Sequence, residues 1–391
     1  MSRALVEHLR ALVATPSQAG IDKLDAVLAV QSAWLKGHGV PFTMVGPKKA
    51  PDAIVINPPE HADEEVWVLN ACMDTAAVGD PAQWQHAPFA GAVHGGWLYG
   101  RGSADSKAAV AIFSALARRV QLTSRGDVNG GKRRRVTVVL DNDEHSGRFG
   151  GIKSYTARFG FPQHCAIGYP GFDDIVAGSR GFFRTVLTLR GEMGHSGAAT
   201  VPAELATTKL HLLLRALETL NKRQPADAAA FPHGPRASCT QIFTGPRTYS
   251  VTASKIDCAI DIRLTPDFDA AAAAAFLRRT ARRIAGAVGD QHPTDWTEPE
   301  GWPPYRTPAH ALLPRLMQAA AKDVLGRELP LSVSGPSNIG NYLAGQGTQV
   351  LCGFGVDFRG LHGADECVRV ETMARVHAVY AAAVRRFIAG A

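Results

Sequence analysis

The chain has 391 residues, of which 46% are hydrophobic and 20% charged, a composition typical of soluble globular proteins and not of disordered ones. Two domains are expected at this length, because a single core rarely grows beyond about 250–300 residues. The formal net charge is +7, but the excess is spread along the chain. Its one dense cluster, Lys132 to Arg135, is interpreted as a solvated turn, and no motif indicates binding to nucleic acid.

The sequence also excludes an ordinary membrane or secreted protein. No apolar run approaches the roughly 20 residues needed to cross a bilayer, and the first ten residues alternate apolar and charged side chains, unlike a secretory signal. The six cysteines show no paired spacing, so reduced thiols are expected. We therefore predict a cytoplasmic protein that works away from membranes.

The first 180 residues alternate between helical and strand-like apolar patterns. We predict two helices within 1–37, strands at 53–56, 66–69, 95–99, 135–140 and 165–168, and helices at 108–120 and 150–159. This alternation predicts an α/β domain with a central, mostly parallel sheet flanked by helices.

The pattern changes near residue 180 and returns to its first form near residue 300. The middle part predicts a strand at 182–189, a helix at 202–222, strands at 238–243 and 255–264, and a helix at 269–287; helices at 309–325 and 371–388 and a strand at 349–352 follow. We therefore predict a catalytic domain formed by residues 1–180 and 296–391. An inserted α+β lid or dimerisation domain at 181–295 interrupts it.

Four segments carry side chains that bind metal ions, each close to the end of a predicted strand or helix. Considered alone, each has a simpler interpretation, such as a helix cap, a polar turn or an ordinary loop histidine. Together they indicate one assembled site. The residues concerned are Cys72 and Asp74, Asp105 in the glycine-flanked turn 100–107, Glu144 and His145, and His362.

Three further observations suggest chemistry. Glu144 and His145 follow a predicted buried strand, where an imidazole can bind a metal while the adjacent carboxylate takes a proton from water. His195 lies between glycine-rich neighbours and is suited to donate a hydrogen bond to an oxyanion. Arg263 ends a predicted strand, where its planar guanidinium suits a substrate carboxylate, although a strand-end salt bridge is an equal alternative.

The order of these segments and the residue types in them resemble one known family. The resemblance rests on the runs 69–75 and 98–107, on Trp84, Pro88 and Phe89, on Asp143-Glu144, Gly194-His195-Ser196 and Asp261-Ile262-Arg263, and on His362. Together they resemble the co-catalytic zinc hydrolases that include acetylornithine deacetylase, succinyl-diaminopimelate desuccinylase, aminoacylase and carboxypeptidase G. The resemblance implies a zinc-binding α/β domain and a lid through which many members dimerise.

The resemblance also implies roles for individual residues. Asp105 would be the carboxylate that bridges two metal ions, His362 a ligand of one of them, and Glu144 the general base. His195 would stabilise the tetrahedral intermediate, in dimeric members from the neighbouring subunit. Arg263 would hold the substrate carboxylate, and we place Asn338, in a loop that differs from the family's usual turn, beside it as a substrate-binding residue.

Three positions depart from the family pattern. Cys72 replaces a metal-binding histidine, His145 replaces a second glutamate, and Tyr169 replaces a later acidic ligand. Asp74, which in the family orients the replaced histidine, keeps an expected catalytic role. Thiolate and imidazole both bind zinc, whereas tyrosine is a poor ligand at neutral pH. We therefore predict one Zn²⁺ held by Asp105, His145 and His362, with an open position for water. Cys72, Asp105 and Tyr169 would form a weak or empty companion site; a second zinc ion, and substitution by Co²⁺ or Mn²⁺, stay open.

The function predicted from these residues is metal-dependent hydrolysis of an amide C–N bond in an N-acyl amino acid, a dipeptide or a related small molecule, by a homodimer joined through the lid. One alternative is a non-catalytic or regulatory relative that kept the fold after losing metal ligands. Another makes Cys72 a nucleophile assisted by His145.

Overall fold

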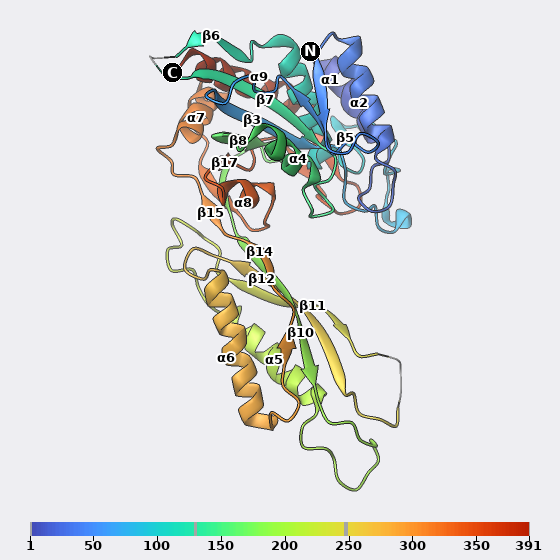
Figure 1. The fold of residues 1–391 in the computed structure, drawn as a ribbon. Coiled ribbons are helices and arrows are strands. Elements are labelled where there is room, and N and C mark those ends of the chain that lie inside the picture. Colours follow the sequence, from blue (N-terminus) through green and yellow to red (C-terminus); the bar gives the residue numbers. More distant parts are fainter. Residues whose placement is uncertain (1, 129–130, 246–248, 391) are drawn as a thin grey trace. The chain divides into compact units, whose positions relative to one another are not determined.

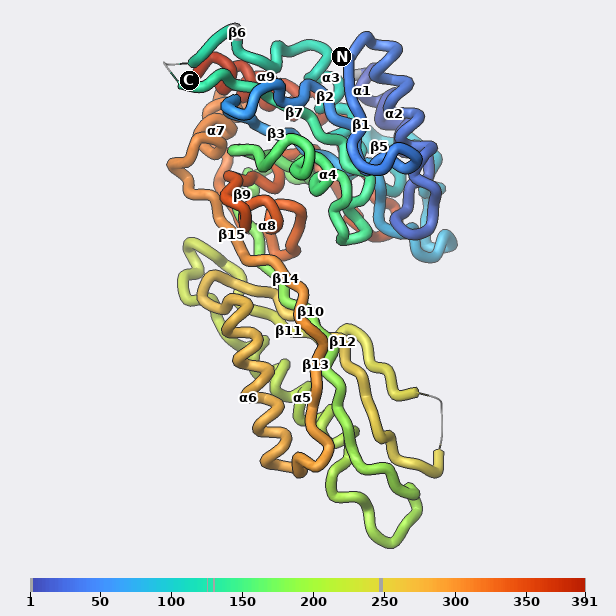
Figure 2. Tube along the Cα trace, in the orientation of Figure 1, coloured from blue at the N-terminus to red at the C-terminus, as the bar shows by residue number. Residues whose placement is uncertain are grey.

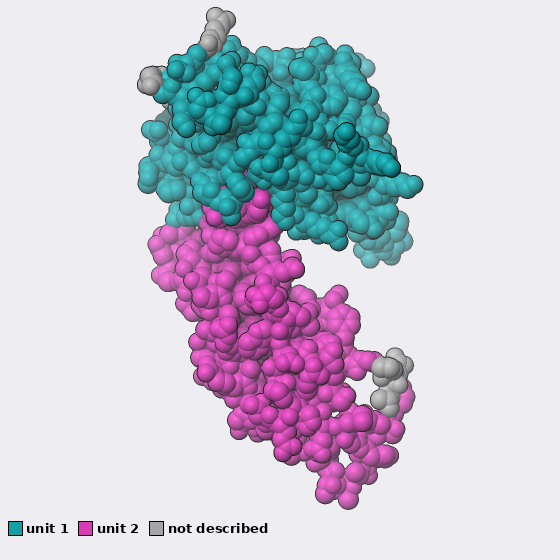
Figure 3. All heavy atoms as spheres, viewed as in Figure 1, with its two compact units in different colours: residues 1–178, 306–332, 346–391 teal, residues 179–305, 333–345 magenta. Residues whose placement is uncertain are grey.

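A computed structural model describes residues 2–128, 131–245 and 249–390. These residues divide into two compact units, coloured separately in Figure 3. Unit 1 comprises residues 1–178, 306–332 and 346–391, and unit 2 comprises residues 179–305 and 333–345. Both labelled ends of the chain lie in unit 1, as the tube in Figure 2 shows.

The main sheet of unit 1 has a parallel centre and antiparallel additions (Figure 1). Its strand order is β1-β2-β7-β3-β8-β17, and β6 also pairs with β7. The parallel neighbours are β7, β3, β8 and β17, whereas β1, β2 and β6 join through antiparallel pairs. The strands are β1 (Phe42–Val45), β2 (Ala53–Ile56), β3 (Glu65–Cys72), β6 (Thr123–Asp127), β7 (Arg133–Asp141), β8 (His164–Ile167) and β17 (Gln349–Leu351).

Helices pack against this sheet because their apolar sides face it. Helix α3 contacts β3 and β7, α9 contacts β6 and β7, and α4 contacts β2 and β7; α1 packs on α3 and α9, and α7 packs on α9. These helices are α1 (Ser2–Val13), α2 (Asp25–Gly37), α3 (Ala108–Arg119), α4 (Gly150–Phe159), α7 (Leu312–Leu325) and α9 (Val370–Ala389). The α/β architecture predicted from the sequence is therefore confirmed.

A second, smaller sheet of unit 1 has the order β18-β19-β5-β4. It consists of β4 (Val93–His94), β5 (Trp97–Tyr99), β18 (Phe358–Arg359) and β19 (Cys367–Arg369). Short helical turns cover Pro81–Gln83 and Ser103–Lys107. Because β5 pairs with β19, this sheet brings residues near 100 beside residues near 365.

Unit 2 has its own sheet and its own hydrophobic core. The strand order is β11-β12-β10-β13, with β14 also paired to β10. Strand β10 alternates buried and more exposed residues, and its buried side faces α5 and α6, so one face of the sheet is covered. The elements are β10 (Gly181–Arg190), α5 (Ala206–Leu220), β11 (Arg236–Phe243), β12 (Lys255–Leu264), α6 (Ala270–Val288), β13 (Asp295–Trp296), β14 (Glu300–Trp302) and α8 (Ile339–Ala344). Strands β9 (Ile175–Ser179), β15 (Tyr305–Arg306) and β16 (Leu331–Ser334) lie where the sequence passes between the units.

The basic cluster at 132–135 is not the solvated turn that the sequence suggests. Arg133 begins strand β7, and Arg135 is only 2% exposed. Its guanidinium pairs with Glu64 at 2.7 and 2.9 Å, and Arg134 pairs with Glu65 at 2.7 Å. The cluster therefore holds the start of β7 to the start of β3.

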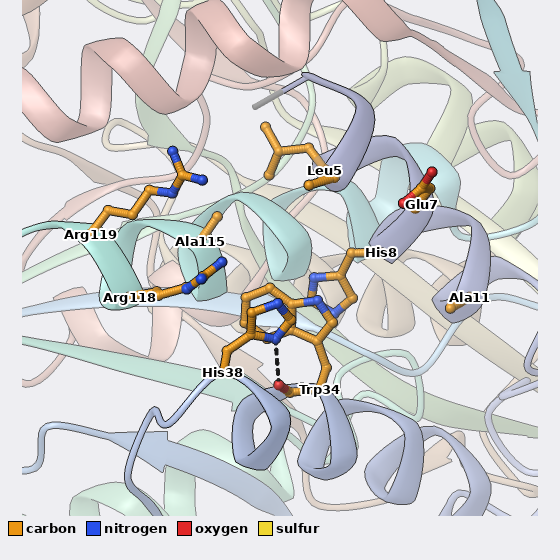
Figure 4. A pocket seen from close by; sticks show the side chains of 10 residues that line it. Leu5, Glu7, His8, Ala11, Trp34, His38, Ala115, Arg118 and Arg119 are labelled. Carbon is orange, nitrogen blue, oxygen red and sulfur yellow. Dashed lines mark hydrogen bonds between the residues drawn. The ribbon is translucent and has the colours of Figure 1, made fainter.

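A cavity of about 270 Å³ lies in unit 1 among α1, α2 and α3 (Figure 4). Its wall includes a stack of three rings, in which Trp34 lies 4.2 Å from His8 and 4.1 Å from His38 between ring centres. None of the metal-binding candidates lines this cavity. Among the described helices, none is both long and apolar enough to cross a membrane.

Candidate metal centre

Parallel strands bring three of the sequence segments to one edge of the main sheet. Cys72 ends β3 and is the register partner of Asp141, the last residue of β7. Glu144 and His145 follow β7, and Tyr169 follows β8, which runs parallel to β3. Because the carboxyl ends of parallel strands share one edge, these side chains gather where α/β sheets place their ligands.

The smaller sheet positions the other two candidate ligands, Asp105 and His362. Strand β5 leads into the turn that holds Asp105, and the loop before β19 holds His362. Cys367 of β19 is the register partner of Tyr99 of β5, so the two loops start from neighbouring positions. This pairing explains how residues 257 positions apart come into contact.

Asp105 lies at the centre of the cluster. Its Oδ2 atom is 3.0 Å from Nε2 of His362 and 3.5 Å from Nε2 of His145, and its Oδ1 atom is 3.7 Å from Sγ of Cys72. Ligand atoms of Cys72, Asp105 and His145 all lie within 4.8 Å of one another. In the part of the chain that the structure describes, no other group of His, Cys, Asp and Glu side chains meets this criterion.

The ring nitrogens of His145 show whether a metal ion would fit this cluster. Both of its ring nitrogens are buried, and neither has a hydrogen-bond partner among the described residues. Burial alone would lower the pKa of His145, but Cys72, Asp105 and Asp74 outweigh that effect and raise it well above its ordinary value. A thiol, an imidazole with unpartnered nitrogens and a carboxylate form a donor set that suits Zn²⁺.

Glu144 lies beside this donor set and is held on two sides. Tyr169 donates its hydroxyl hydrogen to Oε1 of Glu144 at 2.5 Å, and Oε2 is 3.3 Å from Nδ1 of His145. Burial, with a contribution from the Asp105 charge, raises the pKa of Glu144 to about 7. Tyr169 itself stays a phenol, because burial and the neighbouring Glu144 raise its pKa well above the ordinary value.

Asp74 supports the segment that follows β7. Its carboxylate accepts hydrogen bonds from the backbone N–H groups of Glu144 at 3.1 Å and His145 at 2.7 Å. The same carboxylate is 3.7 Å from Nδ1 of His145. In this chain Asp74 therefore holds the histidine that follows β7, not a side chain at position 72.

The three other predicted residues lie in unit 2. His195 is exposed, and its Nδ1 accepts a hydrogen bond from the N–H of Gly197 at 3.0 Å, which leaves the hydrogen on Nε2. Arg263 forms a salt bridge with Asp261 at 2.9 Å and donates to Ser337 at 3.2 Å. The side chain of Asn338 caps α8 by accepting the N–H of Gly340 at 2.8 Å.

Sequence patterns indicate no role for three residues that contact the candidate ligands in the structure. They are Ser106, Arg101 and Glu366. Ser106 Oγ lies 3.1 Å from Sγ of Cys72 and accepts the Cys72 N–H at 2.9 Å. Arg101 and Glu366 form a buried ion pair next to the turn of Asp105. Ser106 and Arg101 lie inside the run 98–107 that resembles the family, whereas Glu366 lies four residues after His362 and outside the runs that carry the resemblance.

Comparisons with known proteins identify the family of this chain. The model of peptidase family M20/M25/M40 matches residues 68–386. A succinyl-diaminopimelate desuccinylase of Psychrobacter sp. (strain PRwf-1) is 26% identical over 332 residues, which cover 81% of this chain and 78% of that protein. The aminopeptidase PepT of Bacillus cereus ATCC 10987 has a similar structure, with a TM-score of 0.72 and 18% identity over 99% of both chains.

A second solved structure is similar across nearly the whole chain. The YXEP protein of Bacillus subtilis, described as a dinuclear metal-binding peptidase, superimposes with a TM-score of 0.65 and 13% identity, covering 98% of this chain and 97% of that one. The family model spans most of this chain and contains all four metal-binding candidates. The chain therefore belongs to peptidase family M20/M25/M40 and is a metallo-hydrolase of the class that acts on amide bonds.

Proposed function

We propose that this protein is a single-zinc hydrolase that cleaves the amide bond of an N-acyl amino acid, a dipeptide or a related small molecule. The observation that supports it most strongly is the convergence of Cys72, His145 and His362 on the carboxylate of Asp105. Co²⁺ and Mn²⁺ suit the same donors. The desuccinylase relative acts on an N-acyl amino acid, which motivates the substrate class.

The ligand set favours one tight cation over two. Tyr169 donates to Glu144 and remains protonated, so it is a poor second-site ligand. The Bacillus subtilis protein is described as dinuclear, whereas the single-cation assignment proposed for this chain rests on its own Tyr169.

The residues of the chain divide the chemistry among them. Zinc, when bound, supplies a Lewis acid and a water of lowered pKa. Glu144, with a pKa raised to about 7 by burial, takes the proton of the attacking water and passes it to the departing nitrogen. We assign to Nε2–H of His195 a hydrogen bond to the developing oxyanion.

Substrate recognition is assigned to unit 2. Arg263 has a planar guanidinium that is 26% exposed, and we assign it the substrate carboxylate. Asn338 caps α8 directly after Ser337, the residue that Arg263 contacts, and so fixes the loop on which that recognition depends.

The test is metal analysis combined with hydrolysis. Purified protein is stripped with a chelator, reloaded with Zn²⁺, Co²⁺ or Mn²⁺, and assayed for amine release from N-succinyl, N-acetyl and dipeptide substrates. We expect one tightly held zinc ion per chain and activity that returns with metal. Two tightly held zinc ions would overturn the single-metal assignment. Failure to bind any divalent metal, with no hydrolysis, would favour a non-catalytic relative.

We further infer a cytoplasmic homodimer joined through unit 2. Strand β11 is an edge strand, and Ile242 and Phe243 at its end are 46% and 57% exposed. Such an edge invites pairing with another strand. All six cysteines are free thiols, as expected in a reducing compartment. Light scattering should give a dimer mass that falls to the monomer mass in the F243E variant; an unchanged mass would contradict this interface.

A further inference from the structure

A buried ion pair joins the two loops that supply Asp105 and His362. Nη1 of Arg101 donates to Oε2 of Glu366 at 2.6 Å, and both side chains are 1% exposed. Burial shields the pair from solvent. It therefore fixes the relative position of the two segments that contain it.

Glu366 accepts hydrogen bonds from the turn that carries Asp105. Its carboxylate accepts the backbone N–H groups of Gly102 at 3.1 Å, Ala104 at 2.8 Å and Asp105 at 3.2 Å. The turn is irregular, since Asp105 has φ −117° and ψ 91°, so it lacks the regular bonds of a helix. The carboxylate of Glu366 substitutes for those bonds.

Arg101 also binds the loop that contains His362, through its second terminal nitrogen. Nη2 donates to the carbonyl oxygens of His362 at 3.1 Å and Gly363 at 3.0 Å. His362 has a left-handed backbone with φ +58°, which is costly for a residue other than glycine. Its side chain is 56% exposed, so packing does little to hold the ring. The backbone bonds from Arg101, together with the contact of the ring with Asp105 at 3.0 Å, define the position of His362.

We propose that Arg101 and Glu366 are positioning residues that set the distance between Asp105 and His362 and thereby tune the affinity of the centre for its cation. They touch neither substrate nor cation in this assignment; they act through the backbone of the two ligands. The inference rests on the metal centre of the proposed function and is independent of the substrate.

The chain offers a matched control for this pair. Arg135 and Glu64 form another buried ion pair of unit 1, at 2.7 Å, with side chains 2% and 1% exposed. Glu64 precedes the first residue of β3, whereas Cys72 is the last residue of that strand. A substitution of Glu64 therefore disrupts an equivalent pair at the far end of the strand from the ligands.

The first experiment compares E366Q with E64Q in full-length protein. Zn²⁺ affinity is measured by competition with a chromophoric chelator, at a temperature where circular dichroism shows both variants folded. We expect E366Q to bind Zn²⁺ about 10- to 100-fold more weakly than the wild type, and E64Q to bind within twofold of it. Equal affinities of E366Q and wild type, or equal losses in both variants, would overturn the positioning role. A wild type that binds no Zn²⁺ would instead remove the proposed centre itself.

The second experiment keeps the inference testable if E366Q does not fold. R101Q leaves Glu366 and its three backbone hydrogen bonds in place but removes the bonds to the His362 loop. We expect R101Q to weaken Zn²⁺ binding and to change the visible absorption of the Co²⁺-loaded protein, which reports ligand geometry. In an H362A background the same substitution should have no further effect on affinity. An equal loss in both backgrounds would show that Arg101 does not act through His362.

Discussion

Glu144 is a carboxylate whose two oxygens meet different neighbours. Tyr169 donates to one oxygen, and the other faces the ring of His145. Burial raises its pKa to about 7, which matches the requirement that a general base titrate near the working pH. Because the hydrogen bond from Tyr169 also fixes the direction of the carboxylate, the proposed base would be oriented before substrate arrives.

Replacing Glu144 by glutamine removes this base while keeping its shape. We expect the turnover number of E144Q to fall by about 10²- to 10⁴-fold, because a neutral amide cannot accept the proton, while the zinc content stays unchanged. D143N is the matched control, since Asp143 is the adjacent carboxylate and its side chain accepts the N–H of Gly150. Near-normal turnover in E144Q would exclude the assigned mechanism.

The buried imidazole of His8 affects the stability of unit 1 in acid. Its Nε2 atom bonds to Gln31 at 3.0 Å, and it stacks on Trp34. Burial, aided by the nearby charge of His38, lowers the pKa of His8 from 6.5 to about 4. The unfolded chain therefore takes up a proton at a higher pH than the folded chain does.

The consequence is a loss of stability on acidification. Between pH 6.5 and pH 4 the unfolded state binds more protons than the folded state, so the free energy of unfolding falls, by up to about 3 kcal/mol from this group. Above pH 6.5 the group contributes no pH dependence. Urea titrations of wild type and H8Q across this range should differ by a slope of that sign. Parallel curves would contradict the assignment.

The turn between β5 and α3 requires glycine at position 102. Gly102 has φ +78°, and a Cβ atom there would lie 2.3 Å from Cγ2 of Thr75. Gly96 has a similar φ of +83° but no atom within 4 Å of the same position. A comparison of the two glycines therefore separates the free-energy cost of the left-handed backbone from the free-energy cost of a steric clash.

Alanine substitutions at these glycines should have unequal effects. We expect G96A to lower the free energy of unfolding by about 1–2 kcal/mol, the cost of a left-handed residue with a side chain. G102A should lower it by a further 1–3 kcal/mol or so, because Thr75 must move. Urea denaturation of both variants measures the difference. Equal losses would mean that the turn relaxes without strain.

The sequence predicted these elements well where apolar spacing was regular. The helix expected at 309–325 is α7, Leu312–Leu325, and the strand expected at 349–352 is β17, Gln349–Leu351. The basic run at 132–135 was misread because its partners, Glu64 and Glu65, lie far away in the sequence. Arg101 and Glu366 were missed for the same reason: they are distant in the sequence, and their proposed roles depend on the pairing of β5 with β19. Local patterns show which residues have suitable chemistry, whereas tertiary contacts decide which of them meet.

At the scale of the whole molecule, the described residues form two separate hydrophobic cores. Leu69, Val138 and Phe113 belong to the core of unit 1, whereas Leu187 and Ile260 belong to that of unit 2. All the metal-binding candidates lie in unit 1. The stability gained from a bound cation should therefore appear in unit 1.

Metal removal provides a test at this scale. A cation present at 100 times its Kd stabilises the unit that binds it by about 2.7 kcal/mol. Hydrogen exchange followed by mass spectrometry should show faster exchange in the turn 103–107 and the loop 360–366 after chelation. Peptides from β10 and β12 of unit 2 serve as the internal control and should exchange at unchanged rates. Uniform acceleration in both units would contradict a cation site confined to unit 1.

The position of unit 2 in the sequence has a consequence for biosynthesis. Cys72, Asp105 and His145 leave the ribosome before unit 2 begins, but His362 and Glu366 follow it. Translation proceeds at about 5–20 residues per second, so the early ligands wait for seconds without their last partners. A nascent chain cannot complete its coordination sphere during that interval. In the proposed centre a cation would therefore be fully coordinated only after residue 362 has been made, and a chain truncated before residue 362 would lack one of the proposed ligands.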